Sequence, residues 1–380
     1  MSERSSWAVV FGGPSPEHEI SILTGLQCER VLTRAGAAVT ALYWAPTGAW
    51  FLVPAGTEAR DFLEGAPSGS RPVEIRLGAD PGLFVKGRMR SERLEVDAAL
   101  STLHGGLGEG GGFAGLFALL GIPATGSTLY ASALGMDKLA FGAVMAAAGI
   151  PSLTRAPLDP ETEPGFDGPY IVKPRFGGSS IGIEIVDDLA TARVLARTST
   201  HLRAGAVLEP FRRDLIDLNI SFRTAPALEV SDLERPLRGA EGVYSYAEKY
   251  LAGQAGEQAG LTSAPREIPA DVPAEVTALA QDLARRVARV TGLTGVVRVD
   301  LLYSPTTHEL YVNEVNSVPG AMALYLWAPR YGAAQVLTDA LVEARDAGVP
   351  TVASGFGSGA ALRAAGGITG KLVGLEGPRG

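Results

Sequence analysis

A single cysteine, Cys28, occurs among the 380 residues of the chain. One cysteine cannot form a disulfide within the chain, so a disulfide framework is excluded and the composition fits a reducing compartment. Long apolar runs are also absent, because no stretch reaches the roughly 18 apolar residues of a membrane-spanning helix. The apolar run in the opening MSERSSWAVVFGG is too short for a signal peptide. We therefore expect a cytoplasmic protein without a membrane partner.

An excess of positive charge is missing as well. Lysine and arginine total 33 against 41 aspartates and glutamates, which gives a net charge of −8. Such a surface has no general attraction for nucleic acid or an anionic membrane. Any phosphate chemistry must therefore depend on local cations.

The remaining composition is that of a folded enzyme, with 46% hydrophobic and 19% charged residues. A chain of 380 residues is too long for one compact core and suits two or three subdomains. Neither an internal repeat nor a heptad pattern is present.

The first 150 residues alternate between strand and helix patterns. An apolar strand ends in a glycine turn and a helix follows, as in a doubly wound α/β domain, and the pattern then repeats. Residues 54–95 have weak periodicity and predict loops and short edge strands. The expected strands are 8–11 and 96–103, and the expected helices are 21–34, 113–120 and 137–148.

From residue 168 the pattern changes to strand, glycine loop, strand, which is typical of a small α+β unit. The clearest helix begins near Asp271, has apolar residues at helical spacing and closes at Gly292. Two strands follow it. Residues 349–380 are rich in Gly and Ala and predict a loosely packed or partly disordered tail. The expected strands are 169–174, 181–186, 206–209, 295–303 and 309–316, with a helix at 189–200.

Polar residues alternate along the last two strands. If Asp300 lies opposite Glu314 in an antiparallel pair, then Arg298 lies opposite Asn316 on the same face. Two carboxylates and an amide oxygen are ligands that suit Mg²⁺. A solvent-facing strand surface with a cross-strand salt bridge would give the same pattern.

A glycine and serine loop, residues 177–180, follows a strand that ends near Lys173. Backbone N–H groups of such a loop can bind phosphate oxygens, and the lysine adds a charge. The order differs from a Walker A motif, since the lysine precedes the glycines. A plain hairpin turn is the alternative interpretation. Lys138, near a helix start, is a second phosphate candidate or a helix-surface lysine.

Eight motifs occur in an order that resembles the D-alanine–D-alanine ligase family. The resemblance covers about residues 7–345 without a break in order. The motifs are PEHEIS (16–21), HGGLGEGG (104–111), GMDK (135–138), VKP with GGSSIG (172–182), LEPF (208–211), YAEKY (246–250), RVD (298–300) and NEVNSVPG (313–320).

The resemblance implies a mixed α/β and α+β chain with the three-subdomain ATP-grasp fold. Its N-terminal domain would be Rossmann-like, the domain that precedes the ATP-grasp in this family. We expect a single cleft that contains Lys138, Lys173, Glu209 and Asp300. The expected domains are residues 1–130, 131–206 and 207–345, followed by a Gly/Ala-rich tail at 346–380.

The resemblance also implies the nucleotide contacts. Lysines would bind the ATP phosphates, the 176–181 loop would cover them, and an acidic side chain would contact the ribose. Asp214 and Asp217 both fit that last role, and Asp217 is favoured at the start of the next strand. The implied ATP-binding residues are Lys138, Lys173, Gly178, Ser180, Glu209, Phe211, Asp217 and Lys249.

The other implied roles concern metal and amino-acid substrates. Glu19 would bind the ammonium of the first amino acid and connect through Ser179 to Tyr250, a set that goes with an amine acceptor. The metal ligands would be Asp300, Glu314 and Asn316, for two Mg²⁺ ions or Mn²⁺. The implied substrate and oxyanion contacts come from Arg298 and Gly320, with His104 and Tyr325 as further substrate residues.

The implied reaction is the ATP-dependent joining of a D-amino acid, D-alanine in the family, to a second amine through an acyl phosphate. This intermediate must be shielded from water, so a mobile lid is expected, and residues 241–265 have the glycine content for one. The oligomeric state stays open, with a homodimer as one alternative.

Departures from the family pattern lie near the second substrate. Gly110 and Ala114 replace an aspartate and a glutamine, and Gly177 replaces a glutamate. The family usually has a serine and leucine beyond NSVPG, whereas this chain has residues 321–325 with Tyr325 as the only hydroxyl. Three interpretations follow: the family reaction of peptidoglycan synthesis, a related ligase with another acceptor in specialised metabolism, or a catalytically dead nucleotide-binding relative.

Overall fold

The computed structural model describes residues 5–87, 89–161, 163–237, 265–349, 359–365 and 368–372. The chain divides into two compact units, Met1–Gly348 and Val349–Gly380. In its described part, the second unit consists of two short helices, α10 (Ala360–Ala364) and α11 (Thr369–Leu372). All of the elements that follow belong to the first unit.

The first sheet has seven strands in the order β6-β5-β4-β3-β2-β1-β7. Strand β1 (Ser6–Gly12), next to the edge strand, pairs in parallel with β2 (Ala38–Trp44) and β7 (Ala98–Ser101). Residues 8–11 of β1 are fully buried because helices and loops cover both faces, which explains their continuous apolar run. The antiparallel extension consists of β3 (Trp50–Val53), β4 (Arg71–Arg76), β5 (Gly82–Lys86) and β6 (Ser91–Arg93), with the short helix η1 (Ala59–Phe62) after β3.

Helix α1 (His18–Arg34) follows β1 and packs on the first sheet. Gly25 lies on the packed face, where a Cβ atom would overlap the side chain of Phe11. The helix can therefore approach the strand closely. After β7 come the π-helical segment η2 (Gly108–Gly112), α2 (Phe113–Leu120), α3 (Leu129–Met136) and α4 (Lys138–Ala147).

The second sheet has four strands in the order β10-β9-β11-β8. Helix α5 (Leu189–Thr198) packs against it and begins at Asp188, whose side chain accepts the backbone N–H of Thr191 at 2.8 Å. The strands are β8 (Ala156–Pro157), β9 (Tyr170–Pro174), β10 (Glu184–Val186) and β11 (Ala206–Pro210), with the short helix η3 (Thr200–Leu202) before β11.

The third sheet has the order β13-β12-β16-β17. Helix α7 (Ala274–Thr291) covers one face, and its apolar stripe buries Val276, Leu283 and Val287 in the core of this sheet. The strands are β12 (Ile216–Arg223), β13 (Glu229–Val230), β16 (Val296–Tyr303) and β17 (Leu310–Asn316). The remaining elements are the β14 (Arg235–Pro236) and β15 (Arg266–Glu267) pair, η4 (Gly320–Ala323), α8 (Leu324–Trp327) and α9 (Ala333–Ala347).

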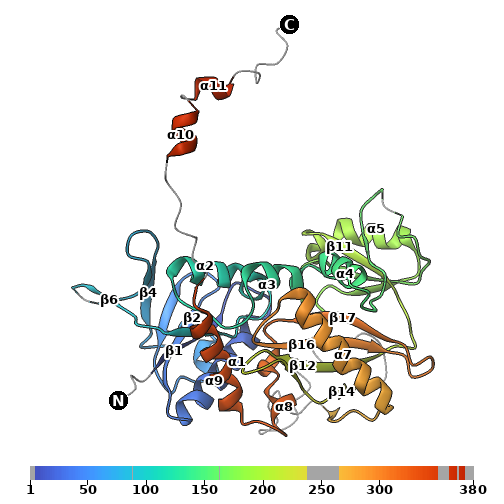
Figure 1. The fold of residues 1–380 in the computed structure, drawn as a ribbon, viewed down its shortest axis with the longest axis horizontal. Coiled ribbons are helices and arrows are strands. Elements are labelled where there is room, and N and C mark those ends of the chain that lie inside the picture. Colours follow the sequence, from blue (N-terminus) through green and yellow to red (C-terminus); the bar gives the residue numbers. More distant parts are fainter. Residues whose placement is uncertain are drawn as a thin grey trace. The chain divides into compact units, whose positions relative to one another are not determined.

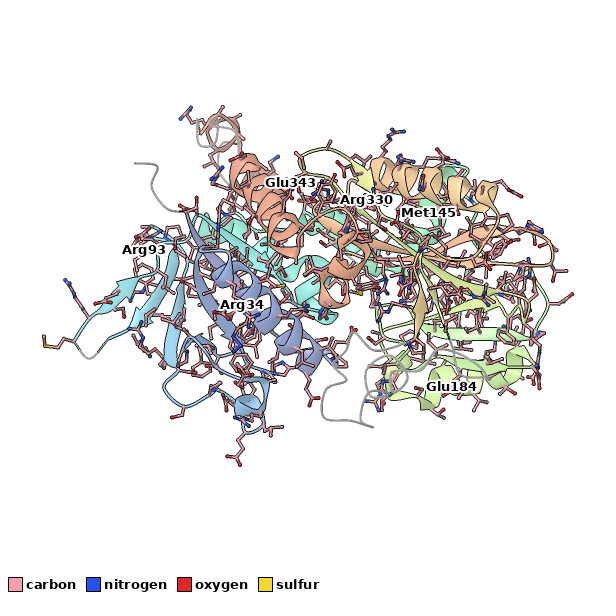
Figure 2. The ribbon with its side chains drawn as sticks, turned by 90° about the horizontal axis from the view of Figure 1, so that it is seen from below. Arg34, Arg93, Met145, Glu184, Arg330 and Glu343 are labelled. Atoms are coloured by element: carbon pink, nitrogen blue, oxygen red, sulfur yellow. The ribbon has the colours of Figure 1, made fainter. Side chains whose placement is uncertain are left out.

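The three sheets lie at different places in the first unit. Figure 1 shows the first sheet in blue on one side, and the third sheet beneath α7 on the other. In Figure 2, Arg93 of the first sheet and Glu184 of the second lie at opposite ends of this unit. Helix α3 contacts both η2 beside the first sheet and β17 of the third.

The predicted mixed α/β class is confirmed. Residues 54–95, expected as loops and short edge strands, contain three antiparallel strands that extend the first sheet. Helix α1 begins at His18, three residues earlier than predicted. No helix in the described ranges is long and apolar enough to cross a membrane.

Candidate functional site

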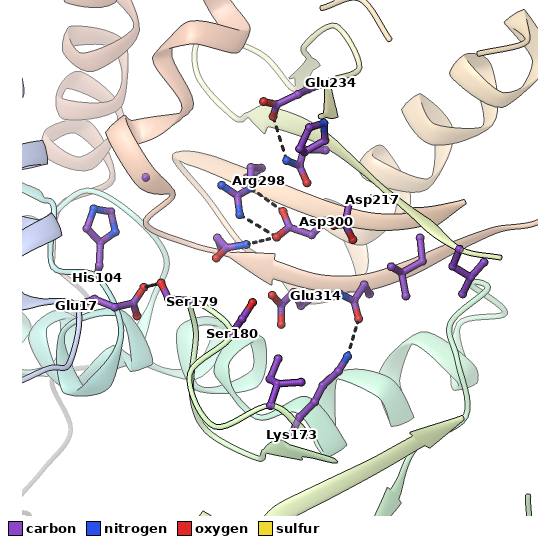
Figure 3. Close-up of a pocket in the computed structure, with 18 of the residues that line it drawn as sticks. Glu17, His104, Lys173, Ser179, Ser180, Asp217, Glu234, Arg298, Asp300 and Glu314 are labelled. Atoms are coloured by element: carbon purple, nitrogen blue, oxygen red, sulfur yellow. Dashed lines mark hydrogen bonds and ion pairs between the residues drawn. The ribbon is translucent and has the colours of Figure 1, made fainter. Parts of the chain in front are cut away.

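A cavity of about 250 Å³ is lined by strands of the second and third sheets, by the start of α1 and by the segment that follows β7. Figure 3 shows Glu17 and His104 at one end, Arg298 and Asp300 in the centre, and Lys173 on another wall. The cavity therefore collects side chains that are far apart in the sequence.

The strand pair β16–β17 has the predicted register. Arg298 lies opposite Asn316, and Asp300 lies opposite Glu314. The guanidinium of Arg298 donates to both carboxylate oxygens of Asp300, at 2.6 and 2.8 Å, and the side chain of Asn316 donates to Asp300 at 3.1 Å. Burial lowers the pKa of Arg298, but the adjacent carboxylate outweighs it and holds this pKa well above its usual value. Arg298 therefore stays charged.

The side chains of this strand pair carry carboxylate and amide oxygens, the ligand types that a divalent cation such as Mg²⁺ binds. Asp300, Glu314 and Asn316 all line the cavity, and Mg²⁺ prefers such oxygens. A carboxylate has about four lone-pair positions, so Asp300 can keep its hydrogen bonds and still bind a cation. Glu314 lies 3.6 Å from the ammonium of Lys138, which offsets repulsion between the two carboxylates.

Lys173 is buried in the wall of the cavity. Its ammonium donates to Glu209 Oε2 at 2.6 Å and to Asn313 Oδ1 at 3.2 Å. Lys138 lines a small neighbouring pocket with Gly178 and Ser180, and donates to the carbonyl of Gly177 at 2.5 Å. The expected single cleft therefore holds Lys173, Glu209 and Asp300, whereas Lys138 lies in the adjoining pocket.

The far end of the cavity has the residues expected around an adenosine. Glu209, Phe211 and Asp217 line it. Asp214 is exposed and does not line the cavity, and its carboxylate accepts from Arg212 at 2.6 and 3.1 Å. Of the two candidates for a ribose contact, the geometry favours Asp217.

The expected connection of Glu19 to Ser179 is wrong, because Ser179 contacts Glu17 instead. Glu19 is exposed at the start of α1, whereas the carboxylate of Glu17 lines the cavity and accepts the hydroxyl of Ser179. Positions 17, 20 and 24 are spaced as on one face of a helix, so Glu17 shares that face with the cavity residues Ile20 and Thr24. This spacing was the signal that could have selected Glu17.

His104 and Glu109 lie beside Glu17. The Nδ1 atom of His104 is 2.7 Å from the carbonyl oxygen of Val318 and therefore carries the proton, while Nε2 faces the Thr24 hydroxyl at 2.9 Å. Burial lowers the pKa of His104, so the ring is neutral. Glu109, which the sequence analysis left without a role, accepts backbone N–H groups of Gly105 and Val318 at 2.9 and 3.1 Å.

Burial, followed by repulsion from Glu17, raises the pKa of Glu109 to about 7. Among the described residues, no ion pair joins a cation to Glu17 or Glu109 at this end. Two carboxylates therefore face a common space with only neutral donors around them.

The opposite wall near Arg298 contains a network that the sequence did not predict. The hydroxyl of Tyr325 donates to the buried Glu234 at 2.9 Å, and Asn219 donates to the same oxygen at 3.0 Å. Arg266 donates to the other oxygen at 3.2 Å and stacks over the Tyr325 ring. Gly320 also lines the cavity here.

Lys249 and Tyr250, and nearly all of the lid expected at 241–265, lie outside the described residues. Their implied roles stay predictions.

Comparison with known proteins gives a consistent result along the chain. A model described as the D-ala D-ala ligase N-terminus matches residues 6–127, and one described as the D-ala D-ala ligase C-terminus matches residues 134–343. A D-alanine–D-alanine ligase from Prochlorococcus marinus is 31% identical over 365 residues, covering 90% of this chain and 97% of that protein. One from Mycolicibacterium smegmatis is 32% identical, covering 87% and 91%.

Solved structures resemble the chain in fold. The VanG D-Ala:D-Ser ligase from Enterococcus faecalis superposes with a TM-score of 0.73 at 24% identity, covering 90% of this chain and all of that one. The D-alanine–D-alanine ligase from Coxiella burnetii gives 0.72 at 21% identity, covering 90% and 96%. The predicted ATP-grasp fold is thereby confirmed.

The raised pKa of Glu109 predicts a pH-dependent stability. An unfolded glutamate has a pKa of 4.5 and the folded one a pKa of about 7, so the folded protein binds more protons between these values. This stabilisation is complete below the lower value and is lost as pH rises through the higher one. From about pH 5 to about pH 8, the melting temperature should fall more for the unmodified protein than for Glu109→Gln.

Glu184→Gln, at an exposed carboxylate on β10, is the matched control and should follow the unmodified protein. Parallel curves for Glu109→Gln and the unmodified protein would contradict the assignment.

Proposed function

The chain belongs to the D-alanine–D-alanine ligase family, and we propose that it is an ATP-dependent ligase that joins D-alanine to a second amino acid through an amide bond. The observation that carries this proposal is the cavity itself. At one end Glu17 and Glu109, for which the described residues supply no cationic partner, line the cavity, and Glu17 accepts the hydroxyl of Ser179. In the middle Arg298 and the Asp300–Glu314 pair meet the wall that contains Lys173.

The unpaired carboxylates support an ammonium site. Glu17 and Glu109 repel one another, and a substrate ammonium between them would relieve that repulsion. Glu17 would then bind the substrate ammonium, which is the role that the resemblance implied for Glu19. The first amino acid would then point its carboxylate toward Arg298.

The central residues support activation of that carboxylate. A carboxylate is a poor electrophile, so the transfer of a phosphoryl group from ATP converts it to an acyl phosphate. Lys138 and Lys173 would neutralise the phosphate charge, and Arg298 with the N–H of Gly320 would stabilise the oxyanion that forms when an amine attacks. Mg²⁺ bound by Asp300, Glu314 and Asn316 would supply further charge neutralisation.

The finer features rest on the family resemblance. We propose two Mg²⁺ ions, with Mn²⁺ as a substitute, a cytoplasmic enzyme that supplies peptidoglycan synthesis, and small-molecule partners only. A homodimer is the proposed assembly.

One observation favours a related ligase with a different acceptor as a second candidate. The proton of the Tyr325 hydroxyl is already donated to Glu234. That hydroxyl can accept a hydrogen bond from a substrate but cannot donate to an acceptor carboxylate without breaking the network. A second substrate with a donor group at this position, such as a hydroxyl or an amide, fits the wall better than a bare carboxylate.

The direct test is ATP consumption with D-alanine, D-serine, D-lactate and small amines, with product masses. We expect phosphate release that depends on D-alanine, and an amide as the main product, because Ser179 and Tyr250 belong to the set that the family resemblance associates with an amine acceptor. Ester formation from D-alanine and D-lactate as the main reaction would refute the amide assignment. ATP binding without any consumption would favour the catalytically dead relative.

Glu17 and Glu19 form a matched pair of variants two residues apart. Glu17→Gln should raise the KM for the first D-alanine by about tenfold or more, because a charge-assisted hydrogen bond to the ammonium is lost. Glu19→Gln changes an exposed carboxylate and should leave KM within about twofold. The reverse ranking in steady-state kinetics would restore Glu19 as the substrate residue.

The metal ligands give a third test. Asp300→Asn and Glu314→Gln remove charge with little change in volume, so both should fold. We expect at least a roughly hundredfold loss of kcat, about 3 kcal/mol of transition-state stabilisation. Circular dichroism and melting temperature provide the folding control, and near-normal activity of both variants at ordinary Mg²⁺ concentration would place the metal elsewhere.

A further inference from the structure

Arg155, between α4 and β8, has a buried guanidinium that no role above uses. Its side chain is 4% exposed. Nε donates to Glu209 Oε1 at 2.8 Å, Nη1 donates to the carbonyl of Lys138 at 2.8 Å, and Nη2 donates to the carbonyl of Asn313. One side chain therefore joins the start of α4, the strand β11 and the strand β17.

These three contacts surround the nucleotide end of the cavity. Lys138 is a phosphate candidate, Glu209 lines the cavity, and Asn313 accepts from Lys173 through its side chain. Arg155 itself does not line the cavity. Any effect of Arg155 on a ligand must therefore pass through its neighbours.

The charges of the cluster determine what Lys173 can offer. Glu209 is 1% exposed and lies between two cations, Arg155 at 2.8 Å and Lys173 at 2.6 Å. Burial raises the pKa of Glu209, but the two cations outweigh it and lower this pKa, so the carboxylate is ionised. The cluster as a whole carries one net positive charge.

The second cation matters because Glu209 must stay paired when Lys173 binds a ligand. If Lys173 were its only partner, any movement of Lys173 toward a phosphate would leave a buried carboxylate unpaired, which is costly. Because Arg155 holds the other oxygen, Glu209 stays paired while Lys173 shares its charge with a ligand. Arg155 thus makes the charge of Lys173 available.

The side chain of Arg155 passes close to α4 at Gly142, where the missing side chain leaves room for it. A Cβ atom on Gly142 would lie 2.7 Å from Cδ of Arg155, closer than such atoms approach. Gly115 in α2 is a comparable helical glycine whose added Cβ would meet Leu129 at an ordinary 3.7 Å. The path of the Arg155 stem therefore depends on glycine at 142.

We propose that Arg155 is a positioning residue of the nucleotide site. It keeps Glu209 ionised and paired, holds the carbonyls of Lys138 and Asn313, and thereby sets the positive charge that Lys173 presents to the phosphates of a nucleoside triphosphate. The identity of this ligand rests on the proposed function.

The test measures binding of a non-hydrolysable ATP analogue with Mg²⁺ by calorimetry, together with KM values for ATP and D-alanine. In Arg155→Met, which keeps the length of the stem and removes the charge, the analogue should bind about tenfold more weakly. KM for ATP should rise by a similar factor, while KM for D-alanine should stay within about threefold. Arg155→Lys, which restores charge but not the forked contacts, should recover part of the loss.

A second pair of variants leaves Arg155 in the chain. Gly142→Ala should displace the stem and weaken analogue binding in the same direction, whereas Gly115→Ala should bind the analogue like the unmodified protein. A double variant, Arg155→Met with Glu209→Gln, removes the unpaired charge, so it should bind no more weakly than Glu209→Gln alone.

The outcomes separate this inference from the proposed function. If the unmodified protein does not bind the analogue, the proposed function fails. If the unmodified protein binds it and Arg155→Met and Gly142→Ala both bind equally well, the positioning role is refuted. Equal increases in both KM values together with a lower melting temperature would also refute it, because they would indicate a general structural role.

Discussion

The antiparallel pairing of β16 with β17 is the constraint on which the rest of the site depends. This register puts Arg298, Asp300, Glu314 and Asn316 on one face of the third sheet. Since side chains alternate along a strand, a shift of one residue would turn the whole set to the opposite face, where α7 packs. The buried apolar residues between them, such as Val299, hold the register through their packing in the core.

Charge balance is the second organising feature of the cavity. In the part of the cavity around Asp300 and Lys173, three carboxylates have a cation beside them: Asp300 has Arg298, Glu314 has Lys138, and Glu209 has both Lys173 and Arg155. At the opposite end, Glu17 and Glu109 have only neutral donors among the described residues. Where phosphates and metal would bind, these carboxylates are thus paired with cations of the protein. Where an ammonium would bind, the described residues supply no cation.

The network around Glu234 gives the third part of the site its character. Tyr325, Asn219 and Arg266 donate three hydrogen bonds to this buried carboxylate, two to one oxygen and one to the other. A buried carboxylate held by several donors resists movement, because breaking any one contact leaves part of its charge unsatisfied. This wall therefore presents a set hydrogen-bonding pattern to the cavity, and its Tyr325 lies where the sequence departs from the family pattern.

The sequence by itself determined the mixed α/β class, the family, and the register of the strand pair β16–β17. These features depend on local periodicity and on motif order, and both can be recognised in the sequence without knowing how the chain packs. It placed Lys173, Glu209 and Asp300 in one cleft, because each belongs to a motif in unbroken order. Even the phase of α1 was available, since 17, 20 and 24 share a helical face.

Only the tertiary structure decided which charges meet. The hydrogen bond between Ser179 and Glu17 joins residues 162 positions apart in the sequence. Arg155 had no sequence signal, since its partners Glu209 and Asn313 lie 54 and 158 residues away. The same holds for Tyr325 and Glu234, 91 residues apart. A buried ion pair is selected by long-range packing and desolvation, and local spacing carries no information about either.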